Sequence, residues 1–319
     1  MNNNIKVCVT TVTYNRKDYL KWLLERLSKI EMVSAIYVFD NYGNDGTLED
    51  FQDVFGHALD VMTEYRVSWK SKDLFYFRND HNSGGSGGFH DVVSLAMNYD
   101  YDYLWIMDDD VLPEIDCLDR LLSCMDDSHM VCVPNRTDDK YSDTAVLCYS
   151  LQNPIKLTPG SRIKRVPCKD IQDEMIEVQA MVFEGPLVDT RIVKKVGLPD
   201  EKYFIFFDDS DYCRRILKYT KVRLVKSAIL HKQIIPEPQT EFGWRDYYSY
   251  RNCFVYDRKY GKNVLVRKLR PYLIRTFGMW NARRKYGKEA HDIIKIAYID
   301  AINDKLGKTV EPGKMKEYL

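Results

Sequence analysis

The segment YLWIMDDD, from Tyr103 to Asp110, places three consecutive carboxylates at the end of an apolar run. The run LWIM is typical of a buried strand. Alternate side chains of an extended segment share one face, so Asp108 and Asp110 can point the same way. Crowded carboxylates repel one another unless a cation is near. Oxygen ligands at this spacing suit Mg²⁺ or Mn²⁺ bridging a diphosphate, whereas a solvated loop or a helix N-cap is the structural alternative.

Strand-like and helix-like patterns alternate on both sides of this segment. Strands are predicted at residues 5–12, 35–40, 73–79 and 129–134, and helices at residues 17–30, 48–55, 87–99 and 114–125. This alternation predicts an α/β fold with a mostly parallel, mixed sheet sandwiched by helices.

A polar motif follows each of four predicted strands. These motifs are TYNR (13–16), DNYGNDGT (40–47), NDHNSGGSGG (79–88) and DDD (108–110). Ligands of such sheets bind at the carboxyl ends of the strands, so the four motifs are expected to meet at one rim. The carboxylate of Asp40 can accept hydrogen bonds from a base N–H or a ribose hydroxyl.

The glycines of the third motif allow positive φ angles and close backbone approach, and the helix after them offers free N–H groups to a ligand. They are Gly84, Gly85, Gly87 and Gly88. Their spacing matches neither a P-loop nor a dinucleotide-binding fingerprint, so a plain flexible turn is an equal alternative.

A second acidic cluster lies in FFDDSDY, residues 206–212, where a helix begins. Its acids are suited to proton transfer, but helix capping and compensation of the helix dipole explain acids at this position equally well. His231 ends the apolar strand predicted at residues 221–231. Contact with a metal or phosphate and a purely structural role are both open for it.

The second half is less regular. Residues 135–180 read as loops and edge strands, followed by a strand at 177–185, a helix at 188–197 and a helical region from Thr240 with a break at Pro271. We therefore divide the chain into an α/β catalytic domain, residues 1–235, and a helical region, residues 236–319, that contacts the acceptor, a membrane surface or another copy.

Charge is balanced overall, with 47 Lys or Arg and 47 Asp or Glu, so net charge indicates no nucleic-acid partner. Between Asp257 and Glu289, however, there are eleven Lys or Arg and no acid. Cations mixed with Leu, Phe and Trp can lie on an anionic membrane surface. A helical pair with solvated cations and a homo-oligomer contact are the alternatives.

The eight cysteines form no C-x-x-C pair and read as small buried side chains, so nothing requires an oxidising compartment. The N-terminus lacks a signal-peptide pattern, and no apolar run approaches the length of a membrane span. The sequence predicts a cytoplasmic protein, with peripheral contact at the inner face of the cell membrane as an option.

These motifs, together with ILH (229–231) and YYSYRN (247–252), occur in the order seen in family 2 glycosyltransferases with the A-type fold. The chain resembles that family over residues 5–260, most closely its galactofuranosyltransferase and rhamnosyltransferase branch, whose glycine motif looks like GGSGGF. It departs from the family pattern in GNDGT, where the family often has a serine after the asparagine.

The resemblance implies an inverting transfer, with Asp209 as the base that takes the proton of the acceptor hydroxyl. Asp108, Asp110 and His231 would bind Mn²⁺ or Mg²⁺, and Asp109 would face the nucleotide and the donor sugar. The remaining implied contacts are Thr13, Asn15, Arg16 and Asp40 with the nucleotide, Gly84, Gly85, Gly87 and Gly88 with the donor sugar, and Asp208, Trp244 and Tyr247 with the acceptor. The two aromatic rings suit the C–H-rich face of a sugar.

We expect a glycosyltransferase that moves a sugar from a nucleoside diphosphate to a hydroxyl of a growing cell-surface glycan, which can be lipid-linked. UDP-galactofuranose is the first candidate donor and dTDP-rhamnose the second. A sugar nucleotidyltransferase would need a glycine-rich basic loop after the first strand, and TTVTYNRKD has none. A non-catalytic glycan-binding protein would not need two acidic clusters.

Overall fold

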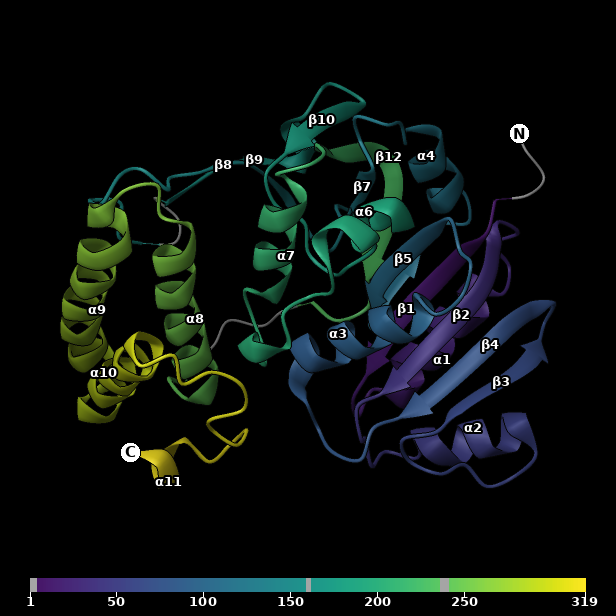
Figure 1. Cartoon of the computed structure of the whole chain (residues 1–319), viewed down its shortest axis with the longest axis horizontal. Coiled ribbons are helices and arrows are strands. Elements are labelled where there is room, and N and C mark those ends of the chain that lie inside the picture. Colours follow the sequence, from purple (N-terminus) through teal and green to yellow (C-terminus); the bar gives the residue numbers. More distant parts are fainter. Residues whose placement is uncertain (1–4, 159–161, 236–240) are drawn as a thin grey trace.

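The computed structural model describes residues 5–158, 162–235 and 241–319. An α/β part built on one large sheet is joined to a bundle of helices at its side (Figure 1). The strands are β1 (Val7–Thr13), β2 (Val33–Asp40), β3 (Glu64–Trp69), β4 (Lys72–Arg78), β5 (Tyr103–Asp108), β6 (Val111–Pro113), β7 (Val131–Asn135), β8 (Thr144–Tyr149), β9 (Ile163–Pro167), β10 (Met175–Val178), β11 (Leu187–Asp189) and β12 (Val222–Lys232).

The helices of the α/β part cover the sheet, and four more follow it. They are α1 (Lys17–Leu27), α2 (Thr47–Phe55), α3 (Gly84–Ala96), α4 (Cys117–Ser123), α6 (Thr190–Val196), α7 (Asp208–Ile216), α8 (Trp244–Tyr260), α9 (Arg270–Tyr286), α10 (Lys288–Ile302) and α11 (Met315–Tyr318).

The main sheet has the strand order β10-β12-β7-β11-β5-β1-β2-β4-β3, and β6 pairs with β12. Strands β5, β1, β2 and β4 are parallel neighbours, as are β7 and β12. Strands β3, β6, β10 and β11 pair antiparallel. The prediction of a mostly parallel, mixed sheet is confirmed.

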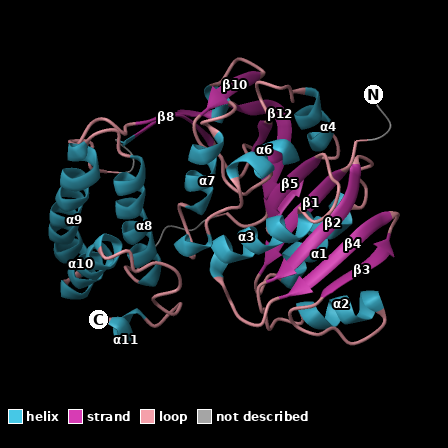
Figure 2. Ribbon diagram, viewed as in Figure 1, coloured by secondary structure: helices cyan, strands magenta, loops and turns pink. Residues whose placement is uncertain are grey.

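Helices lie on both faces of this sheet (Figure 2). Apolar side chains of α3, α6 and α7 form one core against the sheet, and those of α1, α2 and α4 form the other. All seven residues of β1 are buried, as expected for a strand covered on both faces.

Several elements differ from the sequence prediction. Strand β3, an edge strand in which Tyr65, Val67 and Trp69 alternate with polar residues, was not predicted. The strand predicted at 177–185 ends at Val178, where pairing with β12 stops. The helix predicted at 114–125 is shorter, because a turn follows β6 and α4 begins only at Cys117 and ends at Ser123.

The C-terminal helices have a core of their own, to which Phe204 of the α/β part also contributes. The helical break lies at Gly261 rather than at Pro271, which stands in the first turn of α9 directly after a π-helical segment, Leu265–Leu269. Prolines fit such a first turn because its N–H groups lack helical partners. The predicted domain boundary and Thr240 fall at residues 236–240, outside the described residues. No described helix is both long and apolar enough to cross a membrane.

Candidate active site

The polar motifs meet at the carboxyl ends of the parallel strands. The backbone N–H of Asn41 donates to the carbonyl of Thr13 at 2.9 Å, and that of Asn79 donates to the carbonyl of Asp40 at 2.9 Å. Strand β5 pairs with β1 up to Asp108, opposite Val12. Backbone hydrogen bonds and strand pairing therefore bring the carboxyl ends of β1, β2, β4 and β5 together at one rim, as the sequence predicted.

At this rim Arg16 lies against the acidic triplet. Its Nη1 is 3.0 Å from Asp109 Oδ1 and 3.0 Å from Asp110 Oδ2. The two carboxylates are almost buried, while the guanidinium is partly exposed. One cation thus lies beside two of the three acids, and the side chain of Asp108 has neither a hydrogen bond nor an ion pair within the described part of the chain.

Burial dominates the electrostatics of the triplet. It raises the pKa of Asp109 to about 6 even though the charge of Arg16 opposes the shift. Burial and the neighbouring acids raise the pKa of Asp108 well above its usual value, and burial also raises that of Asp110. When its three acids are ionised, the triplet therefore carries more negative charge than Arg16 neutralises.

A divalent cation would balance the excess negative charge of the acidic triplet. No group of three or more His, Cys, Asp or Glu side chains within residues 5–158, 162–235 and 241–319 is arranged to hold a metal by itself. Mg²⁺ is usually bound by one or two carboxylates together with substrate phosphates, so a pair of acids completed by a diphosphate is sufficient. The residues present fit such a shared site.

Glu184 links the two acidic clusters and was missed by the sequence analysis. It accepts hydrogen bonds from Arg136 Nη1 at 2.5 Å and from Lys232 Nζ at 2.7 Å. After burial, its charge is a further cause of the raised pKa values of Asp108 and Asp209. A single acid in the apolar run MVFEG is the signal that could have revealed it.

Asp208 and Asp209 begin α7. Burial, followed by the charge of Asp209, raises the pKa of Asp208 to about 7, and burial raises that of Asp209 to about 6. The backbone N–H of Ser210 donates to Asp209 Oδ1 at 2.5 Å. By contrast, Asp211 is held by Tyr203, Arg215 and Lys259, so it has a structural role. Two acids with pKa values near neutrality are well suited to proton transfer.

The loop directly before α7, which positions Asp208 and Asp209, has an unusual backbone conformation. Phe204, Phe206 and Phe207 have φ angles of 64°, 66° and 70°, which are costly for residues with a side chain. Asn252 of α8, which is fully buried, donates from Nδ2 to the carbonyls of Tyr203 (3.0 Å), Ile205 (2.8 Å) and Phe206 (3.0 Å). The helical region thus holds the strained loop in place.

Replacing Asn252 with leucine is expected to lower kcat by about 10²-fold, because a shift of about 1 Å in a catalytic group costs that much. The KM for the donor should stay within about twofold, since Asn252 does not reach the triplet. Steady-state kinetics with circular dichroism as a folding check would measure this. Asn263→Leu is the matched control, because Asn263 bonds Gln152 instead of the loop. Equal losses in both variants would contradict the assignment.

The glycines are explained mainly by packing. A Cβ at Gly84 would lie 2.2 Å from the carbonyl oxygen of Phe204, and one at Gly88 would lie 2.5 Å from Val12. A Cβ at Gly87 would clash with Ser83 at 2.6 Å. Only the Cβ of Gly85, among these four, would meet open space. Gly84 and Gly88 thus bring α3 close to the strained loop and to β1, and Gly87 leaves room for Ser83. Gly85 has open space beside it, and its contact with a donor sugar stays a prediction.

Two of the predicted nucleotide contacts have internal partners. Asp40 is fully buried and accepts from the backbone N–H of Gly43 (2.8 Å), from the hydroxyl of Tyr76 (2.7 Å) and from Arg78. Asn15 Oδ1 accepts from the backbone of Asn44 at 2.7 Å. These bonds shape the loop after β2, and a direct nucleotide contact of either residue stays a prediction.

Thr13 differs from those two residues. Its side chain is buried, and its hydroxyl lies close enough to Asp109 to lower the pKa of that carboxyl. A contact of Thr13 with the nucleotide stays a prediction.

His231 has a carboxylate on each ring nitrogen. Nδ1 is 2.7 Å from Asp138 Oδ2, and Nε2 is 2.6 Å from Glu114 Oε1. Burial lowers the pKa of His231, but these two acids outweigh it and raise the pKa overall. Metal ligation by His231 stays a prediction, and it would require the ring to give up one of these partners.

The acceptor contact predicted for Tyr247 is wrong. The ring is fully buried, and its hydroxyl donates to Asp300 Oδ2 at 2.6 Å, so no ring face is open to a sugar. The sequence pattern could not show that α8 turns this residue toward α10. Trp244 is partly exposed at the start of α8, and its acceptor contact stays a prediction.

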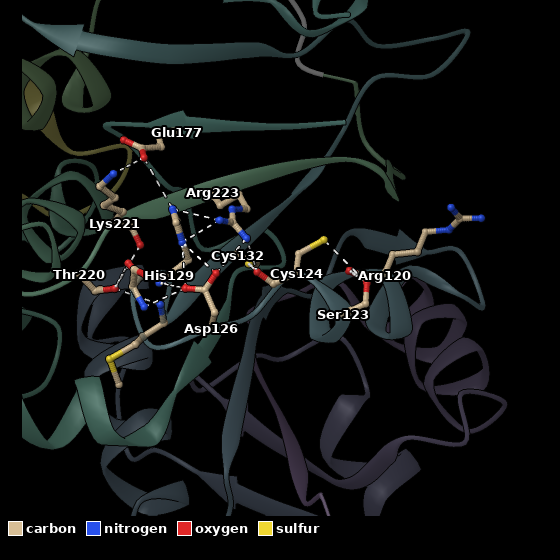
Figure 3. Close-up of polar contacts among 12 residues, drawn as sticks. Arg120, Ser123, Cys124, Asp126, His129, Cys132, Glu177, Thr220, Lys221 and Arg223 are labelled. Carbon is tan, nitrogen blue, oxygen red and sulfur yellow. Dashed lines mark hydrogen bonds and ion pairs between the residues drawn. The ribbon is translucent and has the colours of Figure 1, made fainter. Parts of the chain in front are cut away.

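A second polar cluster lies at the opposite edge of the sheet, where β7 and β12 begin (Figure 3). His129 Nδ1 is 3.0 Å from Asp126 Oδ1 and 2.8 Å from Arg223 Nη2. These bonds tie the turn before β7 to β12. Because ligands of such sheets bind at the carboxyl ends, we assign this cluster a structural role.

The ligand-free protein is expected to gain stability as pH falls from 8 toward 6. The rim acids have pKa values above those of an unfolded chain, so the native state binds more protons in this range and stability falls as pH rises. Asp109→Asn should raise stability at pH 8 by on the order of 1–3 kcal/mol and weaken this pH dependence. Thermal unfolding at several pH values tests this, and a less stable variant at pH 8 would contradict it.

The chain is similar to known proteins in sequence and in fold. The profile of glycosyl transferase family 2 matches residues 8–172. Galactofuranosyltransferase GlfT1 of Mycolicibacterium smegmatis is 24% identical over 220 residues, which are 68% of this chain and 67% of that protein. TarS 1-349 of S. aureus, in complex with UDP-GlcNAc, aligns with a TM-score of 0.56 and 14% identity over 94% of this chain and 82% of that chain.

A third similar protein is the mannosyltransferase PcManGT from Pyrobaculum calidifontis, whose structure is in complex with GDP-Man and Mn²⁺. It aligns with a TM-score of 0.53 and 12% identity over 95% of this chain and 76% of that chain.

The solved structures show that the chain has the A-type glycosyltransferase fold, and the family profile shows that it is a glycosyltransferase. The family profile covers more than half of the chain, so the chain belongs to glycosyl transferase family 2. The predicted fold, family and enzyme class are confirmed.

Proposed function

We propose that this enzyme transfers a sugar, with inversion, from a nucleoside diphosphate sugar to a hydroxyl of a glycan. One observation carries the proposal. The charge of Glu184 acts both on Asp108 of the acidic triplet and on Asp209, which lies next to Asp208 at the start of α7, so the two acidic clusters are near one another. Burial raises the pKa values of Asp208 and Asp209 to about 7 and about 6. A diphosphate leaving group needs an acidic cluster that can hold a cation, and an acceptor hydroxyl needs a second one that can take its proton.

On the donor side, Asp108 and Asp110 would hold Mn²⁺ or Mg²⁺ jointly with the diphosphate, and the metal would neutralise the charge that develops on the leaving group. Arg16 already stands beside Asp109 and Asp110 and is partly exposed, so its guanidinium can turn to a phosphate. Thr13, whose hydroxyl lies beside Asp109, would contact the nucleotide. Complexes of similar proteins with UDP-GlcNAc and with GDP-Man and Mn²⁺ support this arrangement.

On the acceptor side, Asp209 would remove the proton of the attacking hydroxyl while that oxygen bonds to the anomeric carbon. The bond from the anomeric carbon to the diphosphate oxygen breaks in the same step, so the configuration inverts. Asp208, next to it, would contact the acceptor, and Gly85 leaves room for the donor sugar. Holding both reactants in line supplies much of the acceleration.

The donor is proposed by similarity. The likeness to a galactofuranosyltransferase favours UDP-galactofuranose, with dTDP-rhamnose as the second candidate. The acceptor would be a growing cell-surface glycan, which a lipid carrier can anchor.

Incubation with each nucleotide sugar and Mn²⁺, with release of the nucleoside diphosphate as the readout, tests the activity and ranks the donors. Without an acceptor, we expect the enzyme to hydrolyse its own donor slowly, and the other nucleotide sugars more slowly still. Absence of release from every donor, with a folded protein, would contradict the proposal.

A further inference from the structure

The outer side of α9 is exposed, although it carries large apolar side chains. Together with the turn and the π-helical segment before it, it leaves a stripe of apolar residues in solvent, among them Phe277 (53% exposed) and Trp280 (60% exposed). In Figure 1 this helix lies at the edge of the helical bundle that is remote from the sheet. The other apolar members of the stripe are Val264, Leu265, Leu269 and Tyr272.

The same surface is basic. Six exposed cations along it have no ion pair with any residue that the structure describes, and residues 258–288 contain no acid. The guanidinium of Arg284 lies 5.8 Å from the centre of the Trp280 ring. The cations are Arg267, Lys268, Arg283, Arg284, Lys285 and Lys288. We call these cations and the apolar stripe together the α9 face.

We propose that the α9 face docks the enzyme on an anionic membrane surface. Aliphatic and aromatic side chains would enter the boundary between headgroups and acyl chains, and the flanking Lys and Arg would contact anionic headgroups. Trp and Tyr are well suited to this boundary, because each has an apolar body and a polar atom.

Other occupants fit the surface less well. In a symmetric dimer each patch faces its own copy, so a patch with cations and no acids would repel itself. Single-stranded nucleic acid would use the cations and the aromatic rings, but it offers little to the aliphatic side chains Val264, Leu265 and Leu269. An anionic lipid surface uses all three kinds of side chain.

Docking at this place also has a structural consequence. Helices α9 and α10 pack on α8, and Asn252 of α8 holds the loop that aims Asp209. The docked surface and the proposed catalytic base would therefore be joined through one packed set of helices. The proposal does not depend on the chemistry of transfer, because binding to lipid is measurable without any sugar.

The test is co-sedimentation of the full chain with vesicles of phosphatidylcholine alone or mixed with phosphatidylglycerol, at low and high salt. We expect binding only to the mixed vesicles and weaker binding at high salt. Removing four cations, as in R267Q/K268Q/R283Q/R284Q, should reduce binding by at least tenfold, since each cation near an anionic surface contributes roughly fivefold. F277S/W280S should also reduce it by at least tenfold.

Matched controls separate this face from charge in general. K21Q/K29Q/K194Q/K218Q removes four exposed lysines elsewhere, and W22S removes an exposed tryptophan of α1, so both should bind as the wild type does. Circular dichroism would verify folding of each variant. The proposal is overturned if the wild type does not bind anionic vesicles, or if the control and test variants lose vesicle binding to the same extent. Light scattering that shows a dimer lost in F277S/W280S, or preferential binding of single-stranded nucleic acid, would overturn it as well.

Discussion

Asp209→Asn is expected to lower kcat by about 10²–10⁴-fold, the usual contribution of a positioned general base. Asparagine keeps the shape of the side chain and can still accept the hydrogen bond from Ser210, so the start of α7 should be preserved. The loss should fall on turnover and leave donor binding within about twofold. Full turnover in this variant would show that Asp209 is not the base.

Asp208→Asn is the matched control, because Asp208 is the neighbouring acid and has the higher pKa. If Asp209 is the base, the loss in Asp208→Asn should be smaller and should appear partly in the KM for the acceptor. A larger loss in kcat for Asp208→Asn would exchange the two roles.

The same assignment fixes the direction of the pH dependence. A base must be deprotonated to accept a proton, and burial raises the pKa of Asp209 to about 6. Turnover of the wild type should therefore rise with pH through about 6–7 and then level off. Because Asp208 and Asp209 influence each other, the apparent pKa belongs to the pair. A rate that falls over this range would contradict the assignment.

The rim could be predicted from the sequence for two reasons. Hydrophobic patterns show where strands and helices lie, and the carboxyl ends of parallel strands lie at the same edge of a sheet. Asp108, Asp109 and Asp110 were found in this way. For Glu184 the sequence offered only a single acid in an apolar run, and the roles of Glu184 and Asn252 depend on contacts with residues far along the chain. Strand order and helix packing decide such contacts, and local patterns do not record them.

The glycine motif shows a different limit. Its sequence suggested a ligand cradle or a flexible turn, but Gly84 and Gly88 serve close packing against Phe204 and Val12. Tyr247 is a second example, because its aromatic ring is of a type that stacks on sugars, yet it is buried and bonded to Asp300. Residue type indicates what a side chain can do, and burial decides whether it has access to a substrate.

Asp110→Ala is expected to abolish the metal-dependent part of nucleotide binding. In the wild type, UDP with Mn²⁺ at about 100 times the dissociation constant should add about 2.7 kcal/mol of stability, which corresponds to a rise of roughly 5 °C in Tm. Removing Asp110 leaves Asp108 as the nearest unpaired carboxylate, so Mn²⁺ should add nothing to the small effect of UDP alone. A thermal-shift series with UDP, Mn²⁺ and both together measures this.

Folding failure would not explain such a loss, because burial raises the pKa of Asp110 and its removal relieves repulsion at the rim. The ligand-free variant should therefore be at least as stable as the wild type at pH 8. Asp116→Asn is the matched control, since Asp116 is an exposed acid that pairs with Arg120 on α4. If Asp110→Ala keeps the full metal-dependent shift, the cation does not bind at the acidic triplet, and the donor side of the proposed mechanism must be placed elsewhere.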